Sequence, residues 1–122
     1  MHLRRTGELH AHRWSQAATT DFVTCCTRDR RPGLNALPGI GPLVAAVASS
    51  DATGDTATLA FTAMPDHVHW LFILGSRLSL CSVIGRWKAD TRVAMLASDL
   101  TWQRDYFEHR LRPDEEREAY AL

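Results

Sequence analysis

The chain has no surplus of charge, because 14 basic and 14 acidic side chains give its 122 residues a formal net charge of zero. Proteins that bind nucleic acid through their overall charge usually have a basic surplus, so the composition argues against that mode of binding. The charges are unevenly distributed along the chain, however. The basic group near the start comprises Arg4, Arg5, Arg13, Arg28, Arg30 and Arg31, and the acidic group near the end comprises Asp114, Glu115, Glu116 and Glu118.

Cysteines and long apolar runs are also scarce. Cys25 and Cys26 are neighbours whose side chains diverge along a strand, Cys81 stands alone, and no CxxC pair is present. The sequence therefore predicts packed thiols in a reducing compartment. No apolar run approaches the length of a membrane span, and the arginine-rich start lacks the apolar stretch of a signal peptide. We expect a cytoplasmic protein without a membrane association.

The length is that of a single domain. Residues 1–18 are polar and have no clear period, so they are interpreted as a loosely packed arm, and residues 19–122 as the domain. Patterns of alternation and of three- and four-residue spacing then give the expected elements. In chain order they are a strand at 21–28, an irregular connection at 30–42, a helix around 43–49, strands at 57–63 and 67–74, a helix at 80–98, a strand at 106–111 and the start of a helix at 114–122.

This order of elements predicts the fold class. Two helical crossovers and one tight hairpin are typical of an α+β, ferredoxin-like (split βαβ) antiparallel sheet with helices packed on one face. The helix at 80–98 is the clearest element, with an apolar stripe that includes Trp87 and with Ser79 placed as its N-cap. Lys88 and Arg92, one turn apart, flank the stripe and are expected to stay near solvent.

The most informative residues are His67 and His69, which begin an apolar run after the turn Met64-Pro65-Asp66. Residues two apart in a strand point to the same face, so the two imidazoles should lie side by side. Such a pair is either a two-nitrogen metal site or a pair of partly buried, hydrogen-bonded histidines. Imidazole favours zinc, copper or nickel by affinity, whereas phosphate chemistry in cells commonly uses Mg²⁺ or Mn²⁺.

Four blocks of the sequence carry a family resemblance. Met64-Pro65-Asp66-His67-Val68-His69 and the apolar run after it resemble the metal-binding motif of the HUH single-tyrosine transposases, in particular the REP-associated tyrosine transposases. The other blocks, in the order found in that family, are similar to its first strand with a basic turn, its lysine-bearing helix and its Trp-Gln…Asp-His…Arg strand. They are residues 21–32, 84–92 and 101–112.

The resemblance implies a transposase-like protein that acts on single-stranded or hairpin DNA with a divalent metal, Mg²⁺ or Mn²⁺, as a homodimer. In the intact family, a tyrosine cleaves and rejoins the strand through a phosphotyrosine, which stores the energy of the broken bond. His67 and His69 would be the metal ligands, and His109 a possible accessory ligand. Asp66 is expected to be a turn residue that faces away from His67. The expected DNA-binding residues are Arg28, Arg30, Arg31, Lys88 and Arg92.

The chain departs from the family near its end. The family's last helix usually reads Tyr-Ile-x-x-Asn-Pro, whereas here the sequence reads Tyr120-Ala121-Leu122. Either Tyr120 is the catalytic residue in a shortened, incomplete last helix, or the nucleophile lies beyond residue 122; the second alternative is our expectation. We therefore expect the chain to bind DNA but to cleave it little. Two functions stay open: a DNA strand transferase and a catalytically inactive hairpin-binding module.

Overall fold

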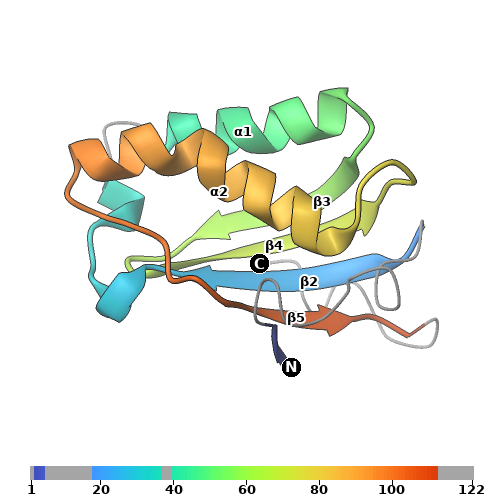
Figure 1. Cartoon of the computed structure of the whole chain (residues 1–122), viewed down its shortest axis with the longest axis horizontal. Helices are drawn as coiled ribbons and strands as arrows, with labels where there is room; N and C mark the ends of the chain where they lie inside the picture. The colour runs from blue at the N-terminus through green and yellow to red at the C-terminus, as the bar shows by residue number, and fades with distance from the viewer. Residues whose placement is uncertain (1, 5–17, 37–39, 113–122) are drawn as a thin grey trace.

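The computed structural model describes residues 2–4, 18–36 and 40–112, which form one antiparallel sheet with two α-helices on one side (Figure 1). The strand order across the sheet is β1-β5-β2-β4-β3. The strands are β1 (His2–Arg4), β2 (Thr20–Cys26), β3 (Thr56–Ala63), β4 (His67–Leu74) and β5 (Tyr106–Arg110). The helices are α1 (Gly41–Ala52) and α2 (Leu80–Ala97), with single 3₁₀ turns η2 (Arg28–Arg30) and η3 (Leu34–Ala36).

The connectivity confirms the predicted α+β, ferredoxin-like class. Strands β2 and β3 each pair antiparallel with β4, so they run parallel to one another with β4 between them and α1 as their connection. In the same way, β4 and β5 both pair antiparallel with β2 and are joined through α2. These two interleaved crossovers are the split βαβ arrangement. Among the described residues, no helix is both long and apolar enough to cross a membrane.

Some elements differ from the sequence-based expectation. Helix α1 starts at Gly41, earlier than the apolar residues alone suggest, because Pro42 fits the first turn of a helix. The strand expected at 21–28 ends at Cys26 and is followed by η2, and the connection expected to be irregular contains η3. His2–Arg4, inside the expected arm, form the short edge strand β1 beside β5. The helix expected from residue 114 onward lies outside the described residues.

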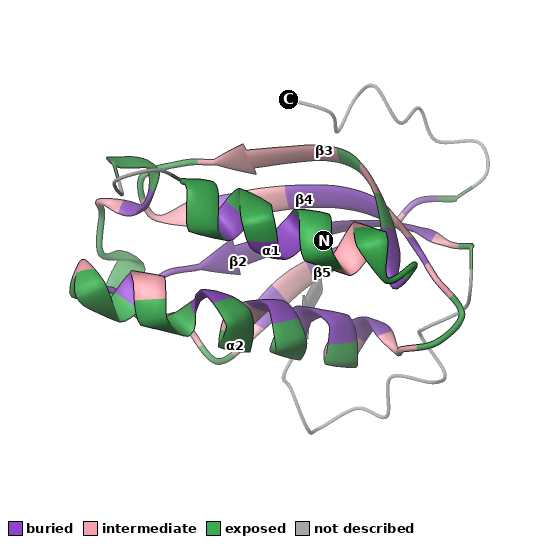
Figure 2. Cartoon of the chain, turned by 90° about the horizontal axis from the view of Figure 1, so that it is seen from above, coloured by how far each residue is buried: buried purple, intermediate pink, exposed green. Residues whose placement is uncertain are grey.

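The two faces of the sheet have different surroundings. Both helices pack on one face, where Trp70 of β4 and Trp87 of α2 are each 1% exposed at the centre of the core. Figure 2 shows α1 and α2 side by side across this face, with their buried residues toward the strands. The opposite face carries a second, smaller apolar cluster that contains Phe22 and Leu71. Strand alternation places His67 and His69 on this second face, away from the helices.

Candidate functional site

Three loops meet at one end of the sheet, where β2 ends and β4 and β5 begin (Figure 1). The Thr27 N–H donates to the carbonyl oxygen of Asp66 at 2.9 Å, which ties the end of β2 to the turn before β4. The Arg28 N–H donates to the carbonyl oxygen of Thr101 at 2.8 Å, which ties η2 to the segment before β5. Residues distant in the sequence are thereby fixed around the first residues of β4.

The two histidines point their Nε2 atoms at each other. The distance from His67 Nε2 to His69 Nε2 is 3.2 Å. Each ring is held from behind through its other nitrogen: His67 Nδ1 lies 2.7 Å from Asp66 Oδ1, and His69 Nδ1 lies 3.0 Å from Thr24 Oγ1. Phe22 stacks on His69 with ring centroids 5.2 Å apart. The local alternation of β4 predicted the shared face, and the neighbouring strand and the turn supply the partners that orient the rings.

The surroundings of His69 favour a neutral imidazole. Burial, and then the neighbouring His67, lowers the pKa of His69 below its ordinary value. Two hydrogen bonds lower the pKa of Asp66, and the one from His67 has a larger effect than the one from Arg30. This carboxyl is therefore ionised and accepts from His67 Nδ1. The Nε2 atom of His67 faces that of His69 on the other side of the ring. A carboxylate behind a ligating histidine is the usual arrangement at metal sites, where it fixes the tautomer and raises the basicity of the ligand.

Two imidazole nitrogens fit a divalent cation as part of its ligand set. Within the part of the chain that the structure describes, no group of three His, Cys, Asp or Glu side chains is placed to hold a metal. Asp66, expected to face away from His67, contacts it from behind through Oδ1. His109 lies on the same face of the sheet, but it pairs in register with Phe22, two residues along β2 from the partner of His69. The remaining positions around a cation would be open to water or phosphate oxygens.

An arginine-lined surface adjoins the histidine pair. Arg28 and Arg30 line a hollow of about 580 Å³ together with Trp102, Gln103 and Arg104. Arg30 Nε donates to Asp66 Oδ2 at 2.9 Å, so this hollow and the histidine pair share one carboxylate. Sequence reasoning missed Arg104 because it lies in a loop far along the chain from Arg28 and Arg30, and only the pairing of the strands brings them together.

The other predicted basic residues lie around the same loop. Arg31 lines a neighbouring hollow of about 470 Å³ and pairs with Asp99 at 2.8 Å. Arg92 is exposed on α2 and lines a third hollow, of about 340 Å³, which shares Trp102 with the first. Trp102 itself packs on the core, because its indole N–H donates to Thr91 Oγ1 at 2.8 Å. All five predicted DNA-binding side chains, Lys88 included, therefore lie around segment 101–104.

Lys88 corrects the sequence-based expectation of a solvated side chain. Its ammonium donates to three successive backbone carbonyls, those of Gln103 at 2.7 Å, Arg104 at 3.2 Å and Asp105 at 3.3 Å. Burial lowers the pKa of this amine. The periodicity of α2 could place Lys88 beside the apolar stripe but could not show that a distant loop returns its carbonyls there. Lys88 holds one wall of the arginine-lined hollow in position.

Replacing Lys88 with Met should lower the free energy of unfolding by about 2 kcal/mol, because three carbonyls lose a charged hydrogen-bond donor. The methionine keeps most of the length of the apolar stem. Arg92→Met, an exposed change one turn along the same helix, should stay within about 0.5 kcal/mol of the unchanged protein. Urea denaturation of both variants measures the difference. Equal stabilities would show that Lys88 does not hold the loop.

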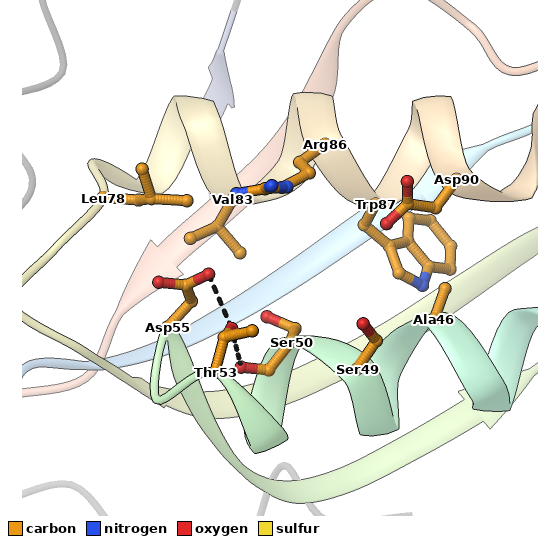
Figure 3. Close-up of a pocket in the computed structure, with 10 residues that line it drawn as sticks. All are labelled: Ala46, Ser49, Ser50, Thr53, Asp55, Leu78, Val83, Arg86, Trp87 and Asp90. Carbon is orange, nitrogen blue, oxygen red and sulfur yellow. Dashed lines mark hydrogen bonds between the residues drawn. The ribbon is translucent and has the colours of Figure 1, made fainter.

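A separate hollow of about 240 Å³ lies between the two helices (Figure 3). One of its walls carries Asp55, which accepts from Arg77 Nε at 2.9 Å and from Nη2 at 2.7 Å. Arg86 and Asp90 of α2 border it as well, so its charges are mixed. This hollow is on the helix-covered side of the sheet, opposite the histidines. Arg86, which lines this hollow, is therefore a control residue remote from the histidine pair.

The sequence has two tyrosines, Tyr106 and Tyr120, and the structure describes the first of them. Tyr106, at the start of β5, is 2% exposed and belongs to the helix-side core. Its side chain therefore lies on the face of the sheet opposite the histidine pair. Tyr120, one of the two alternatives for the nucleophile, lies outside the described residues.

Comparisons with known proteins find solved structures of similar fold. No protein-family model matches the chain, and no curated protein sequence matches it. The structure of a REP-associated tyrosine transposase bound to a REP hairpin superposes with a TM-score of 0.68 and 21% sequence identity. The match covers 86% of this chain and spans 62% of the length of that transposase. The predicted transposase-like fold is thereby confirmed.

Proposed function

We propose that this chain binds single-stranded or hairpin DNA at the end of the sheet where His67, His69 and the arginine-lined hollow adjoin. The observation that carries the proposal is the convergence of two imidazole Nε2 atoms 3.2 Å apart beside Arg28, Arg30 and Arg104. The fold shared with a transposase bound to a REP hairpin supports the same function. On the sequence resemblance alone, we further propose a homodimer in the cytoplasm.

Each group has a chemical role in this proposal. The guanidinium groups of Arg28 and Arg104 bind backbone phosphates, for which their planar forks are suited. Asp66 and Thr24 orient the imidazoles of His67 and His69 and keep their Nε2 atoms directed at one point. His67 and His69 would hold a Mg²⁺ or Mn²⁺ ion, which would supply charge stabilisation to a scissile phosphate.

The local basic surface accounts for DNA binding by a chain without net charge. Phosphate contacts depend on the side chains that reach the DNA, and acidic residues elsewhere on a surface are screened beyond about 10 Å at 0.1 M salt. Arg28, Arg30 and Arg104 gather at one hollow that also contains Asp29, so basic side chains outnumber acidic ones there. Zero net charge is therefore compatible with a specific DNA site.

A strand-transfer function requires a tyrosine at the site, and Tyr120 is the candidate that we propose. Tyr106 is buried on the other face of the sheet, and the sequence holds no third tyrosine. The second candidate function is a hairpin-binding module without cleavage. It rests on Ala121, which follows Tyr120 where the family resembled usually has isoleucine.

Denaturing gel electrophoresis with a labelled hairpin oligonucleotide and Mn²⁺ distinguishes the two functions. We expect a complex on native gels and little or no covalent adduct on denaturing gels, the result for a binding module. A strong adduct that persists in Tyr106→Phe and vanishes in Tyr120→Phe would instead identify a strand transferase. Absence of a native complex with any hairpin or single strand would refute DNA binding itself.

A further inference from the structure

Asp66 connects the arginine-lined hollow to the histidine pair through its two carboxylate oxygens. Oδ2 accepts from Arg30 Nε at 2.9 Å, and Oδ1 lies 2.7 Å from His67 Nδ1. The Asp66 and His67 side chains are 25% and 19% exposed, whereas that of Arg30 is 57% exposed. The carboxylate is therefore a partly buried bridge between an accessible cation and a metal-competent imidazole.

The backbone on both sides holds this bridge in place. The Asp66 carbonyl accepts from the Thr27 N–H at 2.9 Å, and the Thr27 hydroxyl lies 3.1 Å from the same oxygen. On the other side, Asp29 and Arg30 have φ angles of 57° and 54°, in the left-handed region that residues with a side chain rarely adopt. Two successive strained residues persist only where their surroundings fix them, and such strain is concentrated at functional sites.

The Arg30 guanidinium has N–H groups that remain available to a ligand. A guanidinium has five N–H groups, and Arg30 uses Nε for Asp66. Within the described residues, its terminal Nη groups make no hydrogen bond, and the side chain lines both hollows that contain Arg28. A phosphate in either hollow can therefore bind Arg30 from the outside while Asp66 holds it from the inside.

We propose that Arg30 and Asp66 couple DNA binding to metal binding, so that a phosphate on Arg30 and a divalent cation on His67 and His69 raise each other's affinity. The inference rests on the proposed function. A phosphate that shares the guanidinium draws part of its charge away from Asp66. The carboxylate then interacts more strongly with the N–H at His67 Nδ1, which makes Nε2 a better metal ligand. By thermodynamic linkage, the cation must strengthen DNA binding by the same factor.

The test compares the affinity for a hairpin oligonucleotide with and without saturating Mn²⁺, measured by fluorescence anisotropy. We expect Mn²⁺ to tighten binding about tenfold in the unchanged protein, within the usual range of coupling between sites. In Arg30→Gln the ratio should fall to about twofold, the remainder coming from direct contact between cation and phosphate. Asp66→Asn should show the same loss, because it keeps the shape of the bridge but not its charge.

Arg31→Gln is the matched control. Arg31 adjoins Arg30 and lines a hollow beside it, but it pairs with Asp99 instead of Asp66. This variant should bind the hairpin more weakly and yet keep the about tenfold effect of Mn²⁺. Calorimetry without DNA should show that Arg30→Gln still binds Mn²⁺, which excludes simple collapse of the site.

The outcomes separate this inference from the proposed function. If the unchanged protein fails to bind hairpin DNA, the proposed function is wrong and the coupling with it. If it binds DNA but not Mn²⁺, the coupling and the metal site are wrong and DNA binding stands. If both bind but the effect of Mn²⁺ is equal in Arg30→Gln and Arg31→Gln, or is absent from the unchanged protein, only the coupling is wrong. The coupling is supported if saturating hairpin raises the Mn²⁺ affinity of the unchanged protein by the same factor by which Mn²⁺ raises its hairpin affinity.

Discussion

His67→Ala and His69→Ala should each lower the affinity for Mn²⁺ by more than about a hundredfold, since loss of an outer-shell partner alone commonly costs between ten- and a hundredfold. Each substitution removes one of two nitrogens that face each other at 3.2 Å. The fold should persist, because both side chains lie on the face opposite the main core. Isothermal titration calorimetry measures the affinity, and circular dichroism checks the fold.

His109→Ala is the control for this prediction. His109 occupies the same face of the sheet but pairs with Phe22, and within the described residues it joins no group of three metal-ligating side chains. Its replacement should leave the Mn²⁺ affinity unchanged. A matching loss in all three variants would make His109 a ligand. Unaltered binding in both His67→Ala and His69→Ala would leave the pair as hydrogen-bonded histidines without a metal, the alternative that the sequence left open.

Arg28→Ala and Arg104→Ala should each weaken hairpin binding about tenfold, the effect of losing one charged hydrogen bond of about 1.5 kcal/mol. Both side chains line the hollow beside the histidine pair. The logarithm of the binding constant should also depend less steeply on the logarithm of salt concentration, by a slope of about one unit for each lost phosphate contact. Fluorescence anisotropy over a series of salt concentrations gives both quantities.

Arg86→Ala supplies the matched control, because this arginine lies in the hollow between the helices, on the other side of the sheet (Figure 3). It should change the hairpin affinity by less than about twofold, as expected for a surface substitution away from the site. A matched duplex without a loop should bind the unchanged protein more weakly than the hairpin does. Equal affinities for hairpin and duplex, or an affinity independent of salt, would contradict a specific phosphate site.

The sequence by itself determined the features that depend on local periodicity. Alternation along β4 placed His67 and His69 on one face, and the three- and four-residue spacing of α2 placed Trp87 in the core. The order of strands and helices was sufficient to predict the ferredoxin-like class, because two helical crossovers around one hairpin leave few compact arrangements. All of these features follow from residues within one element or from the sequence of elements.

Only the tertiary structure decided which side chains act together. Arg30 and Asp66 are 36 residues apart, and their contact requires the pairing of β2 with β4. Lys88 was expected in solvent because it flanks the apolar stripe of its helix, and it is half-buried because the loop before β5 returns its carbonyls to α2. Contacts between distant segments depend on strand register and loop path, which local periodicity does not encode; the site therefore emerges only when the chain is folded.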